Sequence, residues 1–116
     1  MKVLHKNDNV TKDINKLLRG SDLIVRSKLA KIIDYFNQAK NFLDIWNLKF
    51  LNPHQLSSNR SKQWAVKVDN TKYRVIFYLC NDNDEPIVED NFDILSEAIN
   101  IKTLIIWEVS NKHYAK

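Results

Sequence analysis

The sequence predicts a mixed α+β domain in the order β-α-α-β-β-β, and three observations support this class. A helical repeat of apolar residues spans 22–40. Apolar stretches with strand character lie at 64–68, 73–80 and 103–109. The 116 residues include one glycine and two prolines, too few for a flexible linker between domains. We therefore expect one domain over residues 1–116, near the common size of about 100–150 residues.

The first two expected elements are a short strand and a short helix. Residues 2–6 alternate weakly in polarity, and residues 11–19 have helical periodicity. Thr11 is a suitable N-cap, and Gly20, the only glycine, is placed where a left-handed helix stop is expected. The apolar stripe of this helix consists of Ile14, Leu17 and Leu18.

A longer amphipathic helix is predicted over residues 22–40, with Ser21 or Asp22 as its cap. A joint of one or two residues would make the two helices a helical hairpin. Residues 41–46 add either a further helical turn or a packed loop. The apolar face recurs at the three-to-four-residue spacing of a helix and comprises Val25, Leu29, Ile32, Ile33, Phe36 and Ala39.

The second half of the chain has strand periodicity. Residues 64–68 alternate in polarity, residues 69–71 have turn chemistry, and residues 73–80 and 103–109 are continuous apolar strands of a covered sheet. A polar, acidic insertion at about 81–100 separates the last two strands. We expect a short helix in it, with an apolar face made of Phe92, Leu95 and Ile99.

The net charge of +4 conceals an uneven distribution along the chain. Residues 1–81 carry a net charge of +9, and residues 82–98 carry seven acidic and no basic side chains. A basic body with one acidic segment indicates an anionic partner met away from that segment, although a charged surface also serves solubility alone.

Several classes of protein are excluded or disfavoured. One cysteine permits no internal disulfide and fits a reducing compartment, so we expect a cytoplasmic protein. No secretion signal is visible, and no apolar run approaches the ~20 residues of a membrane span. Glycine-rich phosphate loops and paired zinc motifs do not occur, so no cofactor is expected. Zinc held by His54, Cys80 and His113 is a disfavoured alternative.

Two polar clusters adjoin the apolar strands, at residues 53–64 and 110–114, and Arg74 lies inside a strand. A cation in an apolar strand needs a partner or an anionic ligand, and Glu108 on a neighbouring strand is a plausible structural partner for Arg74. An alternative interpretation is that His54 is an ordinary loop residue. Residues 111–114 are similarly interpreted as a frayed tail.

These clusters resemble the RelE/ParE toxin superfamily, and most closely its HigB-like plasmid maintenance killer toxins. The resemblance spans about residues 47–114 and includes the helical pair before them. It rests on an ordered set of residues, namely His54, Leu56, Asn59, Arg60, Gln63 to Val66, Tyr73 to Phe77, Ile106 to Val109 and His113.

The resemblance implies a small antiparallel sheet with the helical hairpin packed on one face. It also implies the toxin of a type II toxin-antitoxin system, a ribosome-dependent endoribonuclease that cleaves mRNA without metal. The expected partners are the ribosome, mRNA and a cognate antitoxin of the helix-turn-helix, HigA-like kind, and no membrane.

Matched by position, the resemblance assigns catalytic roles to four residues. His54 and His113 become the proton-transfer candidates, because the reference pKa of histidine, ~6.5, suits either role. Arg60 and Arg74 become binders of the phosphate or of the transition state. The RNA-binding candidates are Lys62, Asn111, Lys112 and Tyr114.

The chain departs from the family pattern at Ser58 and Lys62, which stand where the pattern has glycines, and in its ending, Asn111 to Tyr114. Two alternatives to the nuclease therefore stay open: a non-enzymatic gyrase inhibitor of the ParE type, and a degenerate toxin that only binds an antitoxin. The acidic insertion is interpreted as a solvated loop, and a segment folded over the basic face is the alternative.

Overall fold

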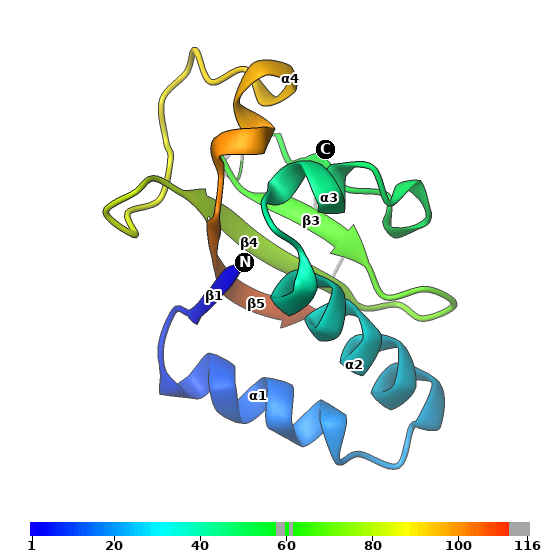
Figure 1. Cartoon of the computed structure of the whole chain (residues 1–116). Coiled ribbons are helices and arrows are strands. Elements are labelled where there is room, and N and C mark those ends of the chain that lie inside the picture. The colour runs from blue at the N-terminus through cyan, green and yellow to red at the C-terminus, as the bar shows by residue number, and fades with distance from the viewer. Residues whose placement is uncertain (58–59, 61, 112–116) are drawn as a thin grey trace.

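The computed structural model describes residues 1–57, 60 and 62–111 (Figure 1). Its single five-stranded sheet has the order β1-β5-β4-β3-β2. The strands are β1 (Lys2–His5), β2 (His54–Gln55), β3 (Trp64–Lys67), β4 (Arg74–Cys80) and β5 (Thr103–Ser110). The helices are α1 (Asp8–Leu18), α2 (Leu23–Gln38), α3 (Phe42–Trp46) and α4 (Ile94–Glu97), with 3₁₀ turns at Lys49–Leu51 and Ala98–Asn100.

The predicted α+β class and element order are confirmed, with two differences in the sheet. Strand β1 pairs in parallel with β5, whereas the other three pairings are antiparallel, so the sheet is mixed rather than wholly antiparallel. Strand β2 was not predicted, because two residues are too short to show an alternation in the sequence.

Helix α1 begins earlier than predicted. Asn7 is its N-cap, and its side-chain oxygen accepts a hydrogen bond from the Val10 amide at 3.0 Å, so Thr11 lies inside the helix. Gly20 does not have a positive φ, and the prediction of a left-handed stop there is wrong. A Cβ at Gly20 would lie 3.3 Å from the Lys16 carbonyl oxygen, so the glycine permits a close approach to the end of the helix.

Helix α2 matches its prediction closely. The Asp22 side chain caps it by accepting hydrogen bonds from the amides of Ile24 and Val25, each at 3.1 Å. The joint from α1 is four residues, longer than expected. The predicted extra turn forms as α3, where the Asn41 side chain caps the Leu43 amide.

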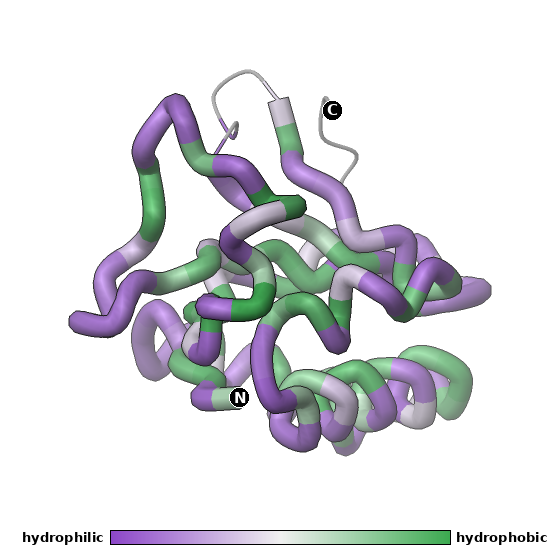
Figure 2. Tube along the Cα trace, turned by 45° about the horizontal axis from the view of Figure 1, so that its top comes forward, coloured by the Kyte–Doolittle hydropathy of each residue, from purple (hydrophilic) through white to green (hydrophobic). Residues whose placement is uncertain are grey.

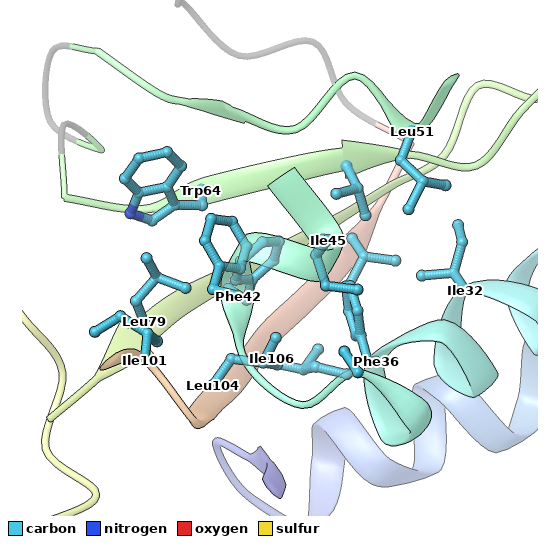
Figure 3. Close-up of a cluster of buried hydrophobic side chains, with 14 of the residues drawn as sticks. Ile32, Phe36, Phe42, Ile45, Leu51, Trp64, Leu79, Ile101, Leu104 and Ile106 are labelled. Atoms are coloured by element: carbon cyan, nitrogen blue, oxygen red, sulfur yellow. The ribbon is translucent and has the colours of Figure 1, made fainter. Parts of the chain in front are cut away.

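Helices α1, α2 and α3 pack against one face of the sheet, and the main core lies between them (Figure 3). The Phe42 ring is central to it, in contact with the rings of Trp46, Trp64 and Phe77 at centroid distances of 6.5, 5.7 and 5.9 Å. The central strands are mainly hydrophobic and the loops at the rim mainly hydrophilic (Figure 2). This core fixes which strand residues point away from the helices.

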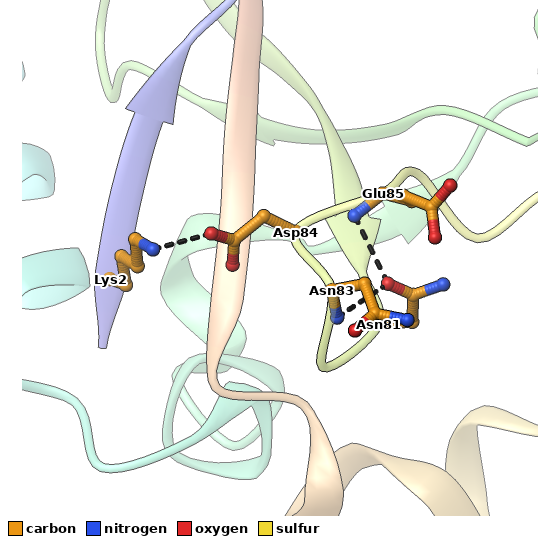
Figure 4. Close-up of polar contacts among 5 residues, drawn as sticks. All are labelled: Lys2, Asn81, Asn83, Asp84 and Glu85. Carbon is orange, nitrogen blue, oxygen red and sulfur yellow. Dashed lines mark hydrogen bonds and ion pairs between the residues drawn. The ribbon is translucent and has the colours of Figure 1, made fainter.

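The acidic insertion is largely exposed, as the interpretation of a solvated loop expects, and it is anchored at a few points. Its first turn is closed by Asn81, whose side-chain oxygen accepts from the amides of Asn83 and Glu85, and Asp84 meets Lys2 of β1 (Figure 4). Further along, the Phe92 ring contacts Trp64 at 6.5 Å.

The predicted apolar face of the insertion helix is wrong. Phe92 packs against the core together with Ile94 and Ala98, whereas Leu95 is 80% exposed and Ile99 is 57% exposed. The helical segment begins only at Ile94 and changes to a 3₁₀ turn at Ala98, so a regular helical spacing from residue 92 does not apply.

Within the part of the chain that the structure describes, no helix is both long and apolar enough to cross a membrane. The same residues contain no group of three or more His, Cys, Asp or Glu side chains able to hold a metal ion.

Candidate functional site

The sheet face opposite the helices carries the polar residues that the sequence singled out, and we call it the polar face. Strand pairing places His54 beside Ala65, Ala65 beside Ile76 and Ile76 beside Glu108, which makes one row across four strands. The next row consists of Lys67, Arg74 and Ser110. Neighbouring rows are about 7 Å apart, because strands rise about 3.4 Å per residue.

A bulge in β5 adjusts this face. The register moves from Ile76–Glu108 to Phe77–Ile106, which leaves Trp107 as the extra residue. The Trp107 ring meets Tyr78 edge to face at 4.9 Å, and the Lys6 ammonium lies 4.4 Å from the centroid of the Trp107 ring. Bulges redirect side chains, and this one brings Trp107 and Glu108 to the same face.

His54 is held in a defined orientation at the edge of the polar face. Asn52 has a left-handed backbone (φ 49°, ψ 53°), and its carbonyl oxygen lies 2.7 Å from Nδ1 of His54. A carbonyl only accepts, so Nδ1 carries the proton of this hydrogen bond and Nε2 is the acceptor of the neutral ring. Nε2 is buried and has no hydrogen-bond partner among the described residues.

Arg60 spans the polar face from the loop before β3. Its guanidinium lies 2.7 Å from a Glu108 carboxylate oxygen and donates to the side-chain oxygen of Gln63 at 2.8 Å. Both charged side chains are about one-third exposed. The sequence suggested Glu108 as a partner for Arg74, and the structure pairs it with Arg60. In the strand register, Glu108 lies opposite Ile76, and Arg74 lies opposite Ser110.

Lys62 is engaged by the acidic insertion. Its ammonium lies 2.6 Å from Asp90, and this contact lowers the pKa of the Asp90 carboxyl below its usual range. The insertion thus reaches a residue that the resemblance assigns to RNA binding.

The structure brings some predicted site residues together and not others. Arg74 lies in the row next to His54 and two strands away, and Asn111 follows β5 beside it. His54 and Glu108 are separated by three strand spacings, about 14 Å between Cα atoms. The predicted residues Lys112, His113 and Tyr114 lie outside the described residues.

Three residues of the site escaped the sequence analysis as site residues. Gln63, which is 4% exposed, orients Arg60, and Glu108 supplies the partner charge. Trp107 reaches the polar face only through the bulge, which breaks the strand alternation. Gln63 could have been noticed as a polar residue directly before an apolar strand, whereas the other two depend on register.

Comparison with known proteins identifies the fold. No protein-family model matches the sequence, and no curated protein matches it. Among solved structures, a YoeB/ParE toxin from Agrobacterium tumefaciens matches with a TM-score of 0.56 and 13% sequence identity, over 98% of this chain and 100% of that chain. The chain has a YoeB/ParE-toxin-like fold.

The match covers both chains almost completely, so the likeness concerns the whole fold and not a part of it. At 13% identity the likeness concerns the fold, and the chemistry has to be argued from the polar face.

Proposed function

We propose that this protein is the toxin of a type II toxin-antitoxin system and acts as a ribosome-dependent mRNA endoribonuclease. The observation that carries the proposal is the His54 ring, with one nitrogen fixed by Asn52 and the other buried without a described partner. An unmet buried acceptor costs about 1–3 kcal/mol, so it requires an explanation beyond folding. A catalytic base is such an explanation, and the proposal requires RNA binding to uncover Nε2, which is closed to solvent in this structure.

The proposed reaction uses the ribose 2′-OH as the nucleophile on the adjacent phosphate. Nε2 of His54 accepts the 2′-OH proton, the oxygen attacks phosphorus, and the 5′ oxygen of the next nucleotide leaves with a proton. His113 is the proposed donor of that proton, on the resemblance alone. Arg60 and Arg74 offer fixed guanidinium donors to the charge that develops on the phosphate oxygens.

The Arg60–Glu108 ion pair is consistent with this role. Both side chains of this pair are about one-third exposed, and an ion pair open to solvent contributes only about 0–1 kcal/mol, so a phosphate that enters the polar face can compete for Arg60. Gln63 meanwhile keeps the guanidinium in position. The YoeB/ParE-like fold supports a toxin partnered by an antitoxin, and the HigB-like subtype, the HigA-like antitoxin and a cytoplasmic site of action belong to this proposal.

Induced expression tests the proposal directly. Wild-type protein should arrest growth, and mapping of 5′ ends should reveal cuts within translated codons. His54→Ala should reduce cleavage by about 10²–10⁴-fold, the usual contribution of a general base. His113→Ala is expected to act similarly.

His5→Ala is the matched control, because His5 lies on β1 and its ring contacts Thr11 at 2.7 Å, away from the polar face. A double variant lacking His54 and His113 that stays as toxic as wild type would refute these roles. Gyrase inhibition in a supercoiling assay, without mRNA cleavage, would replace the nuclease by a ParE-type inhibitor.

A further inference from the structure

A cationic cavity lies beside the proposed catalytic residues, at the end of the sheet where β5 finishes. Its volume is about 470 Å³, and none of the described residues that line it carries a carboxylate. Two of its residues, Arg74 and Asn111, belong to the predicted site, and the others were not singled out by the sequence. The lining comprises Lys67, Thr71, Lys72, Tyr73, Arg74 and Asn111.

The strand register at this cavity brings two cationic side chains together. Lys67 of β3 lies directly opposite Arg74 of β4 on the polar face. With Lys72 in the same lining, they concentrate positive charge at this end of the sheet, which attracts an anionic ligand.

The carboxylate beside Lys67 leaves this lysine able to bind an anion. Lys67 lies 3.8 Å from Asp69, with both side chains nearly half exposed, and such a surface pair contributes at most about 1 kcal/mol. Asp22 lines the adjoining cavity of about 260 Å³, where its oxygen already caps α2. The helix terminus is therefore satisfied, and the lysine and arginine side chains are the groups that offer charge.

We propose that Lys67 and Lys72, together with Arg74 and Asn111, form a subsite for the phosphodiester backbone of RNA. Lysine supplies point charges to phosphate oxygens, arginine a planar fork of donors, and the asparagine amide a neutral hydrogen bond. This inference rests on the proposed function and deepens it, since it assigns Lys67 and Lys72 to the binding of nucleotides that flank the cleaved bond.

The position of the subsite fits that role. Arg74 belongs to the cavity and also to the row adjacent to that of His54, from which it is separated by about 7 Å along the strands and by two strand spacings, about 10 Å, across them. A strand whose scissile phosphate meets Arg74 would thus continue over Lys67 and Lys72. The same backbone chemistry is offered by mRNA and by ribosomal RNA, and the test separates the two.

The experiment measures salt-dependent binding by the purified full chain. One arm uses a fluorescent single-stranded 2′-O-methyl RNA, which lacks the nucleophile and cannot be cleaved, and the other uses vacant ribosomes in a pelleting assay. The variant is Lys67→Gln with Lys72→Gln. The matched control is Lys12→Gln with Lys16→Gln, which removes the same charge from exposed positions on α1.

Loss of two phosphate contacts should lower the slope of log K against log salt by about 1.4 on single-stranded RNA, because each contact contributes about 0.7. The control variant should keep the wild-type slope. A reduced slope on the oligonucleotide assigns the subsite to the substrate strand, and a reduction on ribosomes alone assigns it to ribosomal RNA. Equal slopes for both variants in both arms would overturn the subsite, as would a wild-type protein that binds neither RNA.

The two proposals fail in distinguishable ways. A reduced slope without any mRNA cleavage in cells would leave the subsite standing and remove the nuclease. If cleavage depends on His54 but the salt slope is unaffected by the Lys67 and Lys72 substitutions, the nuclease stands and the subsite is removed.

Discussion

Single residues on the polar face are held by their neighbours rather than by the strands alone. Asn52 directs the His54 ring through its carbonyl, and Gln63 and Glu108 direct the Arg60 guanidinium. Catalytic groups need such supporting contacts, since a side chain displaced by about 1 Å costs much of the rate. The spacing of motifs in the sequence indicates the catalytic candidates His54 and Arg60. It does not indicate the residues that orient them.

Cys80 gives a residue-scale prediction about pH. Burial, and next the nearby negative charge of Asp84, raise the pKa of the Cys80 thiol from 9.0 to about 11. At pH 8 the thiolate fraction in the folded protein should therefore be about 100-fold below that of the unfolded chain. Alkylation by iodoacetamide, followed by mass spectrometry, should be at least that much slower in buffer than in concentrated urea.

The same shift fixes the sign of the effect on stability. Above pH 9 the unfolded thiol ionises while the folded one stays neutral, so the free energy of unfolding should fall between about pH 9 and 11. Cys80→Ser should show a smaller decline over that range. Equal alkylation rates in buffer and urea would contradict the prediction.

At the scale of elements, caps explain where the helices begin. Asn7, Asp22 and Asn41 each accept from an amide of the first helical turn. Asp22 was among the predicted caps because the apolar repeat of α2 starts just after it. Asn7 was not, since α1 has only two buried apolar residues, Val10 and Ile14, and its first turn is polar.

Removal of the Asp22 cap should destabilise the protein measurably. Asp22→Ala loses both hydrogen bonds to the first turn of α2, and such changes cost about 0.5–2 kcal/mol. Urea unfolding followed by circular dichroism measures this difference. Asp22→Asn should retain most of the stability, and Asp13→Ala, an exposed change within α1, should stay within about 0.5 kcal/mol of wild type.

At the scale of the whole molecule, the acidic insertion and the basic body meet at defined contacts. Asp84, near the start of the insertion, pairs with Lys2, and Asp90, near its middle, pairs with Lys62. The insertion is therefore a largely exposed loop, as expected, that is held to the body at these contacts. Phe92 packs against the core, and Ile101 ties the end of the segment to α3. The Ile101 carbonyl oxygen accepts a hydrogen bond from the Phe42 amide at 2.8 Å.

Release of Lys62 should strengthen RNA binding. Asp90→Asn removes the carboxylate that engages Lys62, so affinity for the 2′-O-methyl RNA should rise a few-fold at low salt and converge with wild type at high salt. Asp13→Asn removes an equal charge from α1 and should have a smaller effect.

Acid should also raise the affinity of the wild-type protein for RNA. Because Lys62 lowers the pKa of Asp90, the contact persists at neutral pH and is lost only as the pH falls through that lowered value. An Asp90→Asn variant that binds RNA no better than Asp13→Asn would show that Lys62 takes no part in binding.

The sequence by itself determined the class, the order of the elements and the apolar faces of α2, β3, β4 and β5, because these depend on local periodicity and burial. It also named His54, Arg60 and Arg74, through resemblance. The tertiary structure decided the parallel pairing of β1, the short β2 and the bulge at Trp107. Strand register and the path of a loop are non-local properties: register sets Lys67 beside Arg74, and the loop before β3 brings Arg60 to Glu108.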